Sequence, residues 1–246
     1  MISKFQIKFI KSLHLKKFRT EHHQFIAEGE KNVQELLDSN LSVNFVFALP
    51  DWINKNKTSV TKPTELVEIN EKELQQISSQ VNPNKVLAVA QIPEYPLNFF
   101  SEHTVIALDD IQDPGNLGTI IRVADWYGID TIICSEESVD LFNPKVINST
   151  MGSFCRVKVH YTDLKRYIRH SGKKVYGAVL DGLDIYHTLF EPNCILLFGN
   201  ESHGINDELL KMIDCPITIP RVGKAESLNI AISTAIVCDN FLGRRN

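Results

Sequence analysis

Short apolar runs alternate with segments whose apolar residues recur at helical spacing along most of this chain. In the second half, the apolar runs have strand length and occupy residues 104–110, 131–136, 154–162, 174–181, 194–200 and 216–220. Helices are predicted between most of them, including residues 143–153, 163–172 and 205–213. Continuous apolar strands that alternate with helices predict an α/β fold with a mainly parallel sheet.

The first part of the chain shows the same alternation on a smaller scale. Strand-like runs occupy residues 25–29, 43–49, 64–69 and 85–92, and a helix is predicted after the first run and again between the last two. Residues 91–101 contain two prolines and no hydrophobic period, which is typical of a linker. We therefore expect a small α/β domain over residues 1–95 and a larger domain over residues 102–246.

Three turns in the larger domain combine glycine with polar residues. Residues 110–128 pass from a strand through a Pro-Gly-Asn turn into an amphipathic helix. Residues 194–205 contain a strand that ends at a glycine and continues into a polar turn, and residues 219–236 form a polar loop that enters a helix of small residues. Such turns at strand ends are where open α/β sheets bind ligands.

Taken in order, the three segments resemble the three motifs of the SpoU (TrmH) family of RNA ribose 2′-O-methyltransferases, within the SPOUT superfamily. The matching residues are Asn116 and Arg122 in the first motif, Gly199, Asn200 and Glu201 in the second, and Pro220, Ser227, Leu228 and Asn229 in the third. The resemblance implies a SPOUT fold in which the last helix threads a loop and forms a deep trefoil knot. It also implies that residues 1–95 form a ribosomal-protein-like substrate-binding domain, matched at Phe25, Glu28 and Gly29.

The resemblance further implies methyl transfer from S-adenosylmethionine to a ribose 2′-hydroxyl. The catalytic residues carried over in this way are Asn116, Arg122, Glu201, Ser227 and Asn229. The cofactor-binding residues carried over are Leu180, Gly199, Ile219 and Leu228, where recognition is by the backbone. The work left to the protein is alignment of the reactants, removal of a proton and stabilisation of charge.

Arg122 lies in an otherwise apolar helix, so its guanidinium needs an acceptor. A structural ion pair with Asp109, Asp110 or Asp113 and a contact with the phosphate of the substrate both stay open from the sequence. In the family, the counterpart of Arg122 contacts the target phosphate and assists deprotonation, although an electrostatic role is physically easier because a guanidinium is a poor base. The resemblance also implies a homodimer in which Arg122 of one chain reaches the cofactor pocket of the other.

The composition is that of an ordinary globular protein, with 43% apolar and 23% charged residues among 246. Five cysteines without a CxxC pair favour a reducing compartment over a disulfide framework or a zinc site. No apolar stretch approaches transmembrane length, and the basic start has no signal-peptide core. We expect a cytoplasmic protein that binds neither a membrane nor a metal.

The net charge of −4 does not suggest an RNA partner, but the basic residues are unevenly distributed. The first 20 residues hold six basic side chains and no acid. An acid-free run in an acidic chain favours a phosphate-binding patch over a solvated helix face. The predicted RNA contacts are Lys11, Lys16, Lys17 and Arg19.

Other functions fit the sequence less well. A NAD site lacks the GxGxxG pattern, a hydrolase lacks the GxSxG elbow around Ser202 and His203, and an acid cluster at a strand end is more often a solvated turn than a Mg²⁺ site. A tRNA 2′-O-methyltransferase and a non-catalytic RNA-binding module that keeps the fold remain as alternatives. The separate N-terminal domain favours ribosomal RNA, because the tRNA-specific relatives generally use short terminal extensions.

Overall fold

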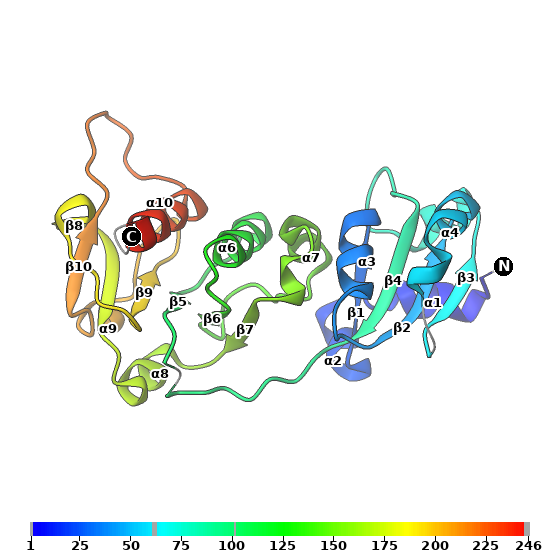
Figure 1. Cartoon of the computed structure of the whole chain (residues 1–246), viewed down its shortest axis with the longest axis horizontal. Coiled ribbons are helices and arrows are strands. Elements are labelled where there is room, and N and C mark those ends of the chain that lie inside the picture. Colours follow the sequence, from blue (N-terminus) through cyan, green and yellow to red (C-terminus); the bar gives the residue numbers. More distant parts are fainter. Residues whose placement is uncertain (1, 61–62, 101, 244–246) are drawn as a thin grey trace. The chain divides into compact units, whose positions relative to one another are not determined.

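A computed structural model describes residues 2–60, 63–100 and 102–243. The chain forms two compact units (Figure 1): unit 1 comprises Met1–Glu94 and Asp140–Cys155, and unit 2 comprises Tyr95–Val139 and Arg156–Asn246. The predicted division assigned all of residues 102–246 to one domain, whereas residues 140–155 pack with unit 1. The packing of this segment depends on side chains far away in the sequence, as described below.

Unit 1 is an α/β unit with a four-stranded sheet. Its strands are β1 (Gln24–Glu28), β2 (Val43–Ala48), β3 (Glu65–Glu68) and β4 (Val86–Gln91), in the order β1-β4-β2-β3. Its helices are α1 (Lys4–Ser12), α2 (Lys16–His22), α3 (Glu30–Leu37), α4 (Pro50–Asn56), α5 (Glu71–Ile77) and α7 (Pro144–Thr150), with 3-10 turns η1 (Lys57–Ser59) and η2 (Ser153–Cys155). β4 pairs antiparallel with β1 and β2, and β2 pairs parallel with β3.

Alternation along β1 explains how unit 1 forms a core on each side of its sheet. Ile26 belongs to the cluster that α1 and α5 complete with Ile10 and Leu74. Its neighbour Phe25 is fully buried and stacks on Phe142 and Phe154, with ring centroids 4.7 and 5.8 Å away. The two last rings belong to the 140–155 segment, so a hydrophobic contact with β1 draws this segment into unit 1.

Unit 2 contains a six-stranded sheet in the order β10-β8-β9-β5-β6-β7, and every pairing among its described strands is parallel. The strands are β5 (Val105–Leu108), β6 (Thr131–Cys134), β7 (Lys158–Tyr161), β8 (Val175–Asp184), β9 (Ile195–Phe198) and β10 (Cys215–Thr218). The helices are α6 (Pro114–Trp126), α8 (Leu164–Ser171), α9 (Asp207–Leu210) and α10 (Ile230–Gly243), and η3 (Ile185–His187) is a 3-10 turn. The predicted α/β class and mainly parallel sheet are confirmed.

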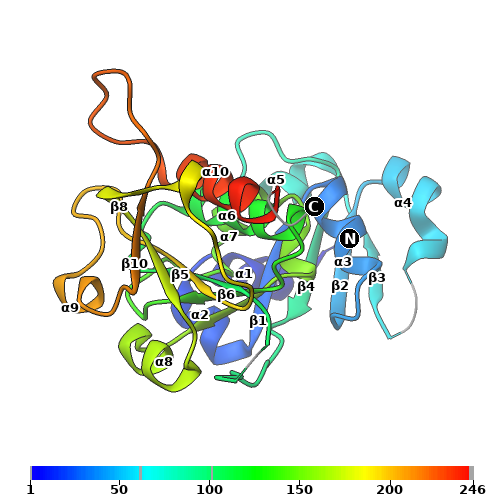
Figure 2. The same cartoon turned by 60° about the vertical axis from the view of Figure 1, so that its left-hand side comes forward.

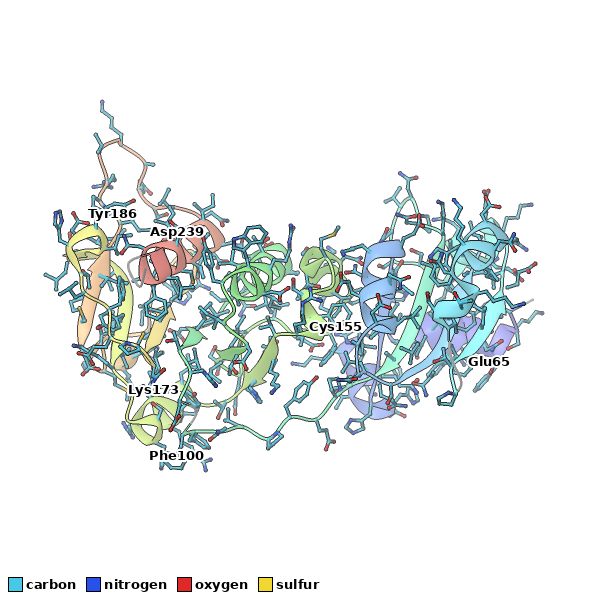
Figure 3. All side chains as sticks on the ribbon, viewed as in Figure 1. Glu65, Phe100, Cys155, Lys173, Tyr186 and Asp239 are labelled. Atoms are coloured by element: carbon cyan, nitrogen blue, oxygen red, sulfur yellow. The ribbon has the colours of Figure 1, made fainter. Side chains whose placement is uncertain are left out.

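Helices cover both faces of this sheet (Figures 1 and 2). On one face α8 contributes Leu164, Tyr167 and Ile168 to a cluster with Val105 and Ala107 of β5. The intervening residues of β5 are equally buried on the other face, where α6 packs against α10. Figure 3 shows Phe100 and Lys173 on the side of α8, and Tyr186 and Asp239 on the side of α10.

The helix predicted over residues 205–213 is much shorter in the structure, because only Asp207–Leu210 is helical. By contrast, α6 runs for 13 residues and has strong start and stop signals. Pro114 occupies the first turn, where no amide hydrogen bond is lost, and the Asp113 side chain accepts a hydrogen bond from the Asn116 amide at 2.8 Å. Gly128 follows the helix at a φ of 68°, which is a usual way for a helix to end.

Candidate active site

The three turns identified from the sequence lie at one edge of the sheet in unit 2. They follow β5, β9 and β10, and the strand order β10-β8-β9-β5 makes these strands near neighbours. Parallel strands present their carboxyl ends at the same edge, so segments separated by up to about a hundred residues converge there. The long loop between β10 and α10 projects from this edge (Figures 1 and 2), and its residues 220–229 are all exposed.

A chain of side-chain hydrogen bonds connects the three turns. The Asn229 Nδ2 group donates to Asn116 Oδ1 at 2.9 Å, and Asn116 Nδ2 donates to Glu201 Oε1 at 2.7 Å. Asn229 Oδ1 also caps α10 by accepting from the Ala231 amide at 2.9 Å. Because each amide has a fixed donor and acceptor side, this chain orients all three groups. Three of the predicted catalytic residues, one from each motif, are therefore in direct contact.

The turn after β9 is closed tightly around Gly199. Asn200 exchanges two backbone hydrogen bonds with Gly204, at 2.9 and 3.0 Å. A Cβ atom placed on Gly199 would lie 2.2–2.4 Å from the backbone of Gly204 and Ile205, which is far inside contact distance. Only glycine therefore permits this closure, and the turn forms a firm wall next to Glu201.

Three aspartates at the end of β5 have separate partners. Asp109 Oδ2 accepts from the Asn206 amide at 2.8 Å, and burial raises the pKa of the Asp109 carboxyl. Asp110 has a φ of 55°, and its carboxylate Oδ2 lies 3.3 Å from His203 Nε2. Asp113 caps α6. Within residues 2–60, 63–100 and 102–243 no group of three His, Cys, Asp or Glu side chains is arranged to hold a metal ion.

A pocket of about 1050 Å³ lies between the turns after β8, β9 and β10. All four predicted cofactor-binding residues line it: Leu180, Gly199, Ile219 and Leu228. The predicted catalytic residues Glu201 and Ser227 line it as well, whereas Asn116 reaches it through its hydrogen bond to Glu201. The structure therefore brings these residues together around one cavity.

The pocket suits S-adenosylmethionine in size and chemistry. Its volume is near the upper end of the range of about 300–1000 Å³ that is usual for small-molecule sites. Apolar walls from Phe198 and Ile217 suit an adenine ring, and the carboxylates of Asp181, Glu201 and Glu226 suit a cationic group. Backbone at the closed Gly199 turn is available for hydrogen bonds, so the residues present fit the cofactor.

Arg122 lies outside this assembly. It is exposed on α6, does not line the pocket, and makes no hydrogen bond or ion pair with the other described residues. Asp109, Asp110 and Asp113, its potential structural partners, are engaged elsewhere. The structural ion pair that the sequence left open is therefore absent from the described part of the chain, and the guanidinium is available to a group outside it.

The predicted RNA contacts divide into two kinds. Lys11, Lys16 and Lys17 are exposed on α1 and α2. Arg19 is only 3% exposed, and its guanidinium donates to Asp140 Oδ2 at 2.6 Å and to the backbone oxygens of Leu13 and His14. The prediction that Arg19 contacts RNA is wrong, because its donors are already taken up inside unit 1.

Sequence reasoning gave no role to His203 or Asp110. Both lie in turns that the motifs identified, but the proximity of their side chains depends on the pairing of β5 with β9 and was not accessible from spacing. The dipeptide Ser202-His203 was considered only as part of a hydrolase motif.

The chain matches known families over both of its parts. Residues 103–239 match the model of the SpoU rRNA Methylase family, and residues 4–88 match that of the MRM3-like substrate binding domain. The chain is 32% identical to the 23S rRNA (guanosine(2553)-2′-O)-methyltransferase RlmP of Bacillus subtilis, over 97% of this chain and 96% of that relative.

Solved structures with the same arrangement extend over the whole chain. A TrmH-family protein from Porphyromonas gingivalis is 37% identical, with a TM-score of 0.89 and 99% of both chains covered. An AdoMet-bound rRNA methyltransferase from Sinorhizobium meliloti is 31% identical, with a TM-score of 0.88 over 99% of this chain and 97% of that one. With the three motifs assembled around one pocket, these similarities show that the chain belongs to the SpoU rRNA methylase family.

Proposed function

We propose that this protein transfers the methyl group of S-adenosylmethionine to a ribose 2′-hydroxyl of ribosomal RNA. The observation that carries the proposal is the hydrogen-bonded chain Asn229–Asn116–Glu201 at the edge of a pocket that fits the cofactor. The relative RlmP, whose name specifies 2′-O-methylation of 23S rRNA, extends over nearly all of this chain and supports the same reaction and RNA class.

The residues of the site have distinct parts in this proposal. The bound cofactor supplies a methyl group on a positively charged sulfur, which is already a strong electrophile. Leu180, Gly199, Ile219 and Leu228 hold it, and Asn116, oriented by Glu201, positions the ribose. Ser227 is an exposed pocket residue available to hydrogen-bond the RNA, and an arginine supplied from outside the pocket neutralises phosphate charge.

Two alternatives give different results in one experiment. Unmodified ribosomal RNA and total tRNA are incubated with the protein and S-adenosylmethionine labelled in its methyl group, and 2′-O-methyl sites are mapped. We expect label in ribosomal RNA alone. Label in tRNA would support the tRNA enzyme, and absence of both label and calorimetric cofactor binding would support a non-catalytic RNA-binding module.

The proposal includes a homodimer in which Arg122 serves the pocket of the partner. Arg122 and Trp126 are four residues apart on α6 and therefore lie on the same face of the helix. Trp126 is 84% exposed, and Ile232 on the adjacent helix α10 is 52% exposed. An exposed tryptophan beside a second apolar residue is typical of a protein interface.

Light scattering is expected to show a dimer, and Trp126→Glu is expected to give a monomer without methyl transfer activity. The control is Phe100→Glu, which places the same charge on a 77% exposed ring on the α8 side of unit 2 (Figure 3). This control should stay dimeric and active. A wild-type monomer with full activity would refute the arrangement.

The proposal also includes the trefoil knot and a cytoplasmic location. The parallel sheet and the long loop before α10 support the knot, and five cysteines without disulfide partners support a reducing compartment. None of the helices in the described ranges has the length and apolar character needed to cross a bilayer.

RNA binding by the basic N-terminal helices is expected to depend on Lys11, Lys16 and Lys17. Neutralising all three should weaken RNA affinity and reduce the slope of log affinity against log salt by up to about three units, because each lost phosphate contact removes about one. Affinity for S-adenosylmethionine should not change. The measurement is fluorescence anisotropy with a ribosomal RNA fragment over a range of salt concentrations.

The matched control neutralises Lys55, Lys57 and Lys72, three exposed lysines elsewhere in unit 1. It makes the same change in net charge and should leave the salt slope close to that of the wild type. Equal slopes for the two triple variants would mean that the N-terminal lysines form only a solvated helix face.

A further inference from the structure

The pocket contains one side chain suited to exchange a proton near neutral pH. Among the described residues that line it, His203 is the only histidine, and it is 62% exposed. Histidine is the usual general base at neutral pH, whereas a guanidinium stays protonated in proteins. Glu201, the nearest carboxylate along the chain, already accepts the amide hydrogen bond of Asn116.

Asp110 holds His203 in a defined orientation. The two carboxylate oxygens have different partners: Oδ1 accepts from Gln112 Nε2, and Oδ2 faces His203 Nε2 at 3.3 Å. The Asp110 backbone is fixed as well, because its amide donates to Ser135 Oγ at 2.8 Å and its carbonyl accepts from Asn200 Nδ2 at 2.7 Å.

The conformation of Asp110 is itself unusual. Its φ of 55° lies in the left-handed region that residues other than glycine rarely adopt. Surrounding hydrogen bonds must maintain such a conformation, and strained residues of this kind cluster at functional sites. Here the strain has a visible consequence, since it directs the carboxylate away from the strand and toward His203.

The contact with Asp110 selects the imidazole tautomer. A carboxylate only accepts hydrogen bonds, so neutral His203 carries its proton on Nε2 and leaves the lone pair on Nδ1. Nδ1 has no partner among the described residues. The groups near His203 are mostly negative, namely Asp109, Asp110 and Glu201, and they stabilise the imidazolium that forms when Nδ1 takes up a proton. The positive charge of Arg221 lies on the loop after β10, which also lines the pocket.

We propose that His203, oriented by Asp110, is the general base that accepts the proton of the ribose 2′-hydroxyl; this inference rests on the proposed function. The 2′ oxygen forms a bond to the methyl carbon, the carbon–sulfur bond breaks with its electron pair going to sulfur, and the hydroxyl proton passes to Nδ1. The imidazolium then returns the proton to solvent. Arg122 acts on phosphate charge and takes no part in this proton transfer.

The test compares His203→Gln with His187→Gln in the full-length protein. His187 is a matched control, because it is exposed and its Nδ1 lies 3.0 Å from Asp184 Oδ2, outside the pocket. With unmodified ribosomal RNA, we expect kcat to fall by at least about 100-fold in His203→Gln and to stay within about twofold in His187→Gln. The cofactor Kd from calorimetry should be unchanged in both.

Two further activity measurements separate a base from a structural residue. The wild-type single-turnover rate should fall as pH is lowered from about 8 to about 5.5, because protonated imidazole cannot accept a proton, and this dependence should vanish in His203→Gln. Added imidazole should restore part of the activity of His203→Ala. Activity of His203→Gln within about threefold of wild type, or an unchanged pH profile, would overturn the proposal.

An independent readout does not use activity. In ¹⁵N NMR spectra of the wild-type protein, the His203 ring, assigned by its loss in His203→Gln, should show the Nε2-protonated tautomer, and Asp110→Asn should abolish this preference. An Nδ1-protonated ring would overturn the proposal. Failure of the wild type to methylate any RNA would refute the proposed function and with it this inference, whereas active His203→Gln would refute the inference alone.

Discussion

Replacement of Arg122 by alanine is expected to lower kcat for methyl transfer by about 100- to 1000-fold, the usual effect of removing one group that stabilises developing charge. The fold should be retained, because Arg122 is exposed in a helix where alanine is favourable and it contacts no other described side chain. Cofactor affinity should also be retained, because Arg122 does not line the pocket of its own chain. Steady-state kinetics and calorimetry measure the two effects separately.

Arg169→Ala is the matched control for this variant. Arg169 is exposed on α8 in the same unit, and it forms no hydrogen bond or ion pair with other described residues. Its replacement should leave kcat within about twofold. If Arg122→Ala kept most of its activity, the assignment of Arg122 to the reaction would be wrong.

Mixed dimers test whether Arg122 acts across the interface. When Arg122→Ala and Glu201→Ala chains are mixed and exchanged in equal amounts, half of the dimers contain one chain of each kind. If Arg122 serves the partner, one of the two sites in such a dimer is intact, and activity should recover to about a quarter of the wild-type value. If Arg122 serves its own chain, no site is intact and no activity should return.

The second large effect concerns stability. Asp140→Ala is expected to lower the free energy of unfolding by about 3 kcal/mol or more, because it leaves the Arg19 guanidinium buried without its counter-charge. The two remaining backbone acceptors, on Leu13 and His14, neutralise no charge. Urea unfolding followed by circular dichroism measures the loss.

The double variant Arg19→Met, Asp140→Ala removes both charges and should recover most of this stability, because a buried pair is often replaced by apolar groups at little cost. Asp51→Ala, at the exposed start of α4, is the control and should cost less than about 1 kcal/mol. A loss of less than about 1 kcal/mol in Asp140→Ala would mean that water reaches Arg19 readily.

Local patterns were sufficient for most of the secondary structure of unit 2. All six predicted strands are present, since continuous apolar runs such as residues 194–198 can be buried on both faces only in a sheet covered by helices. α6 was also predictable, because Pro114 and Gly128 mark its ends. The helix at 205–213 was overestimated, as a short apolar pattern does not distinguish one helical turn from a longer helix.

The site was accessible from sequence only through motifs. Nothing in the spacing of Asn116, Glu201 and Asn229 says that they touch, since 85 and 113 residues separate Asn116 from the other two. Family resemblance placed them in one site, and the roles of the individual residues remain predictions. The contact between His203 and Asp110 could not be anticipated at all, because it requires both the pairing of β5 with β9 and a left-handed residue at the end of a strand.

The sequence by itself determined the α/β class, the strands and main helices, and the identity of the three turns, because hydrophobic periodicity and turn residues act over a few positions. Only the tertiary structure decided that residues 140–155 join unit 1 and that Arg19 is a buried partner of Asp140. These two residues are 121 positions apart, and a basic side chain in an acid-free run looks the same in sequence whether it faces solvent or an aspartate. Burial is set by whichever distant segment covers a side chain, and that information lies in the packing of Phe25 against Phe142 and Phe154.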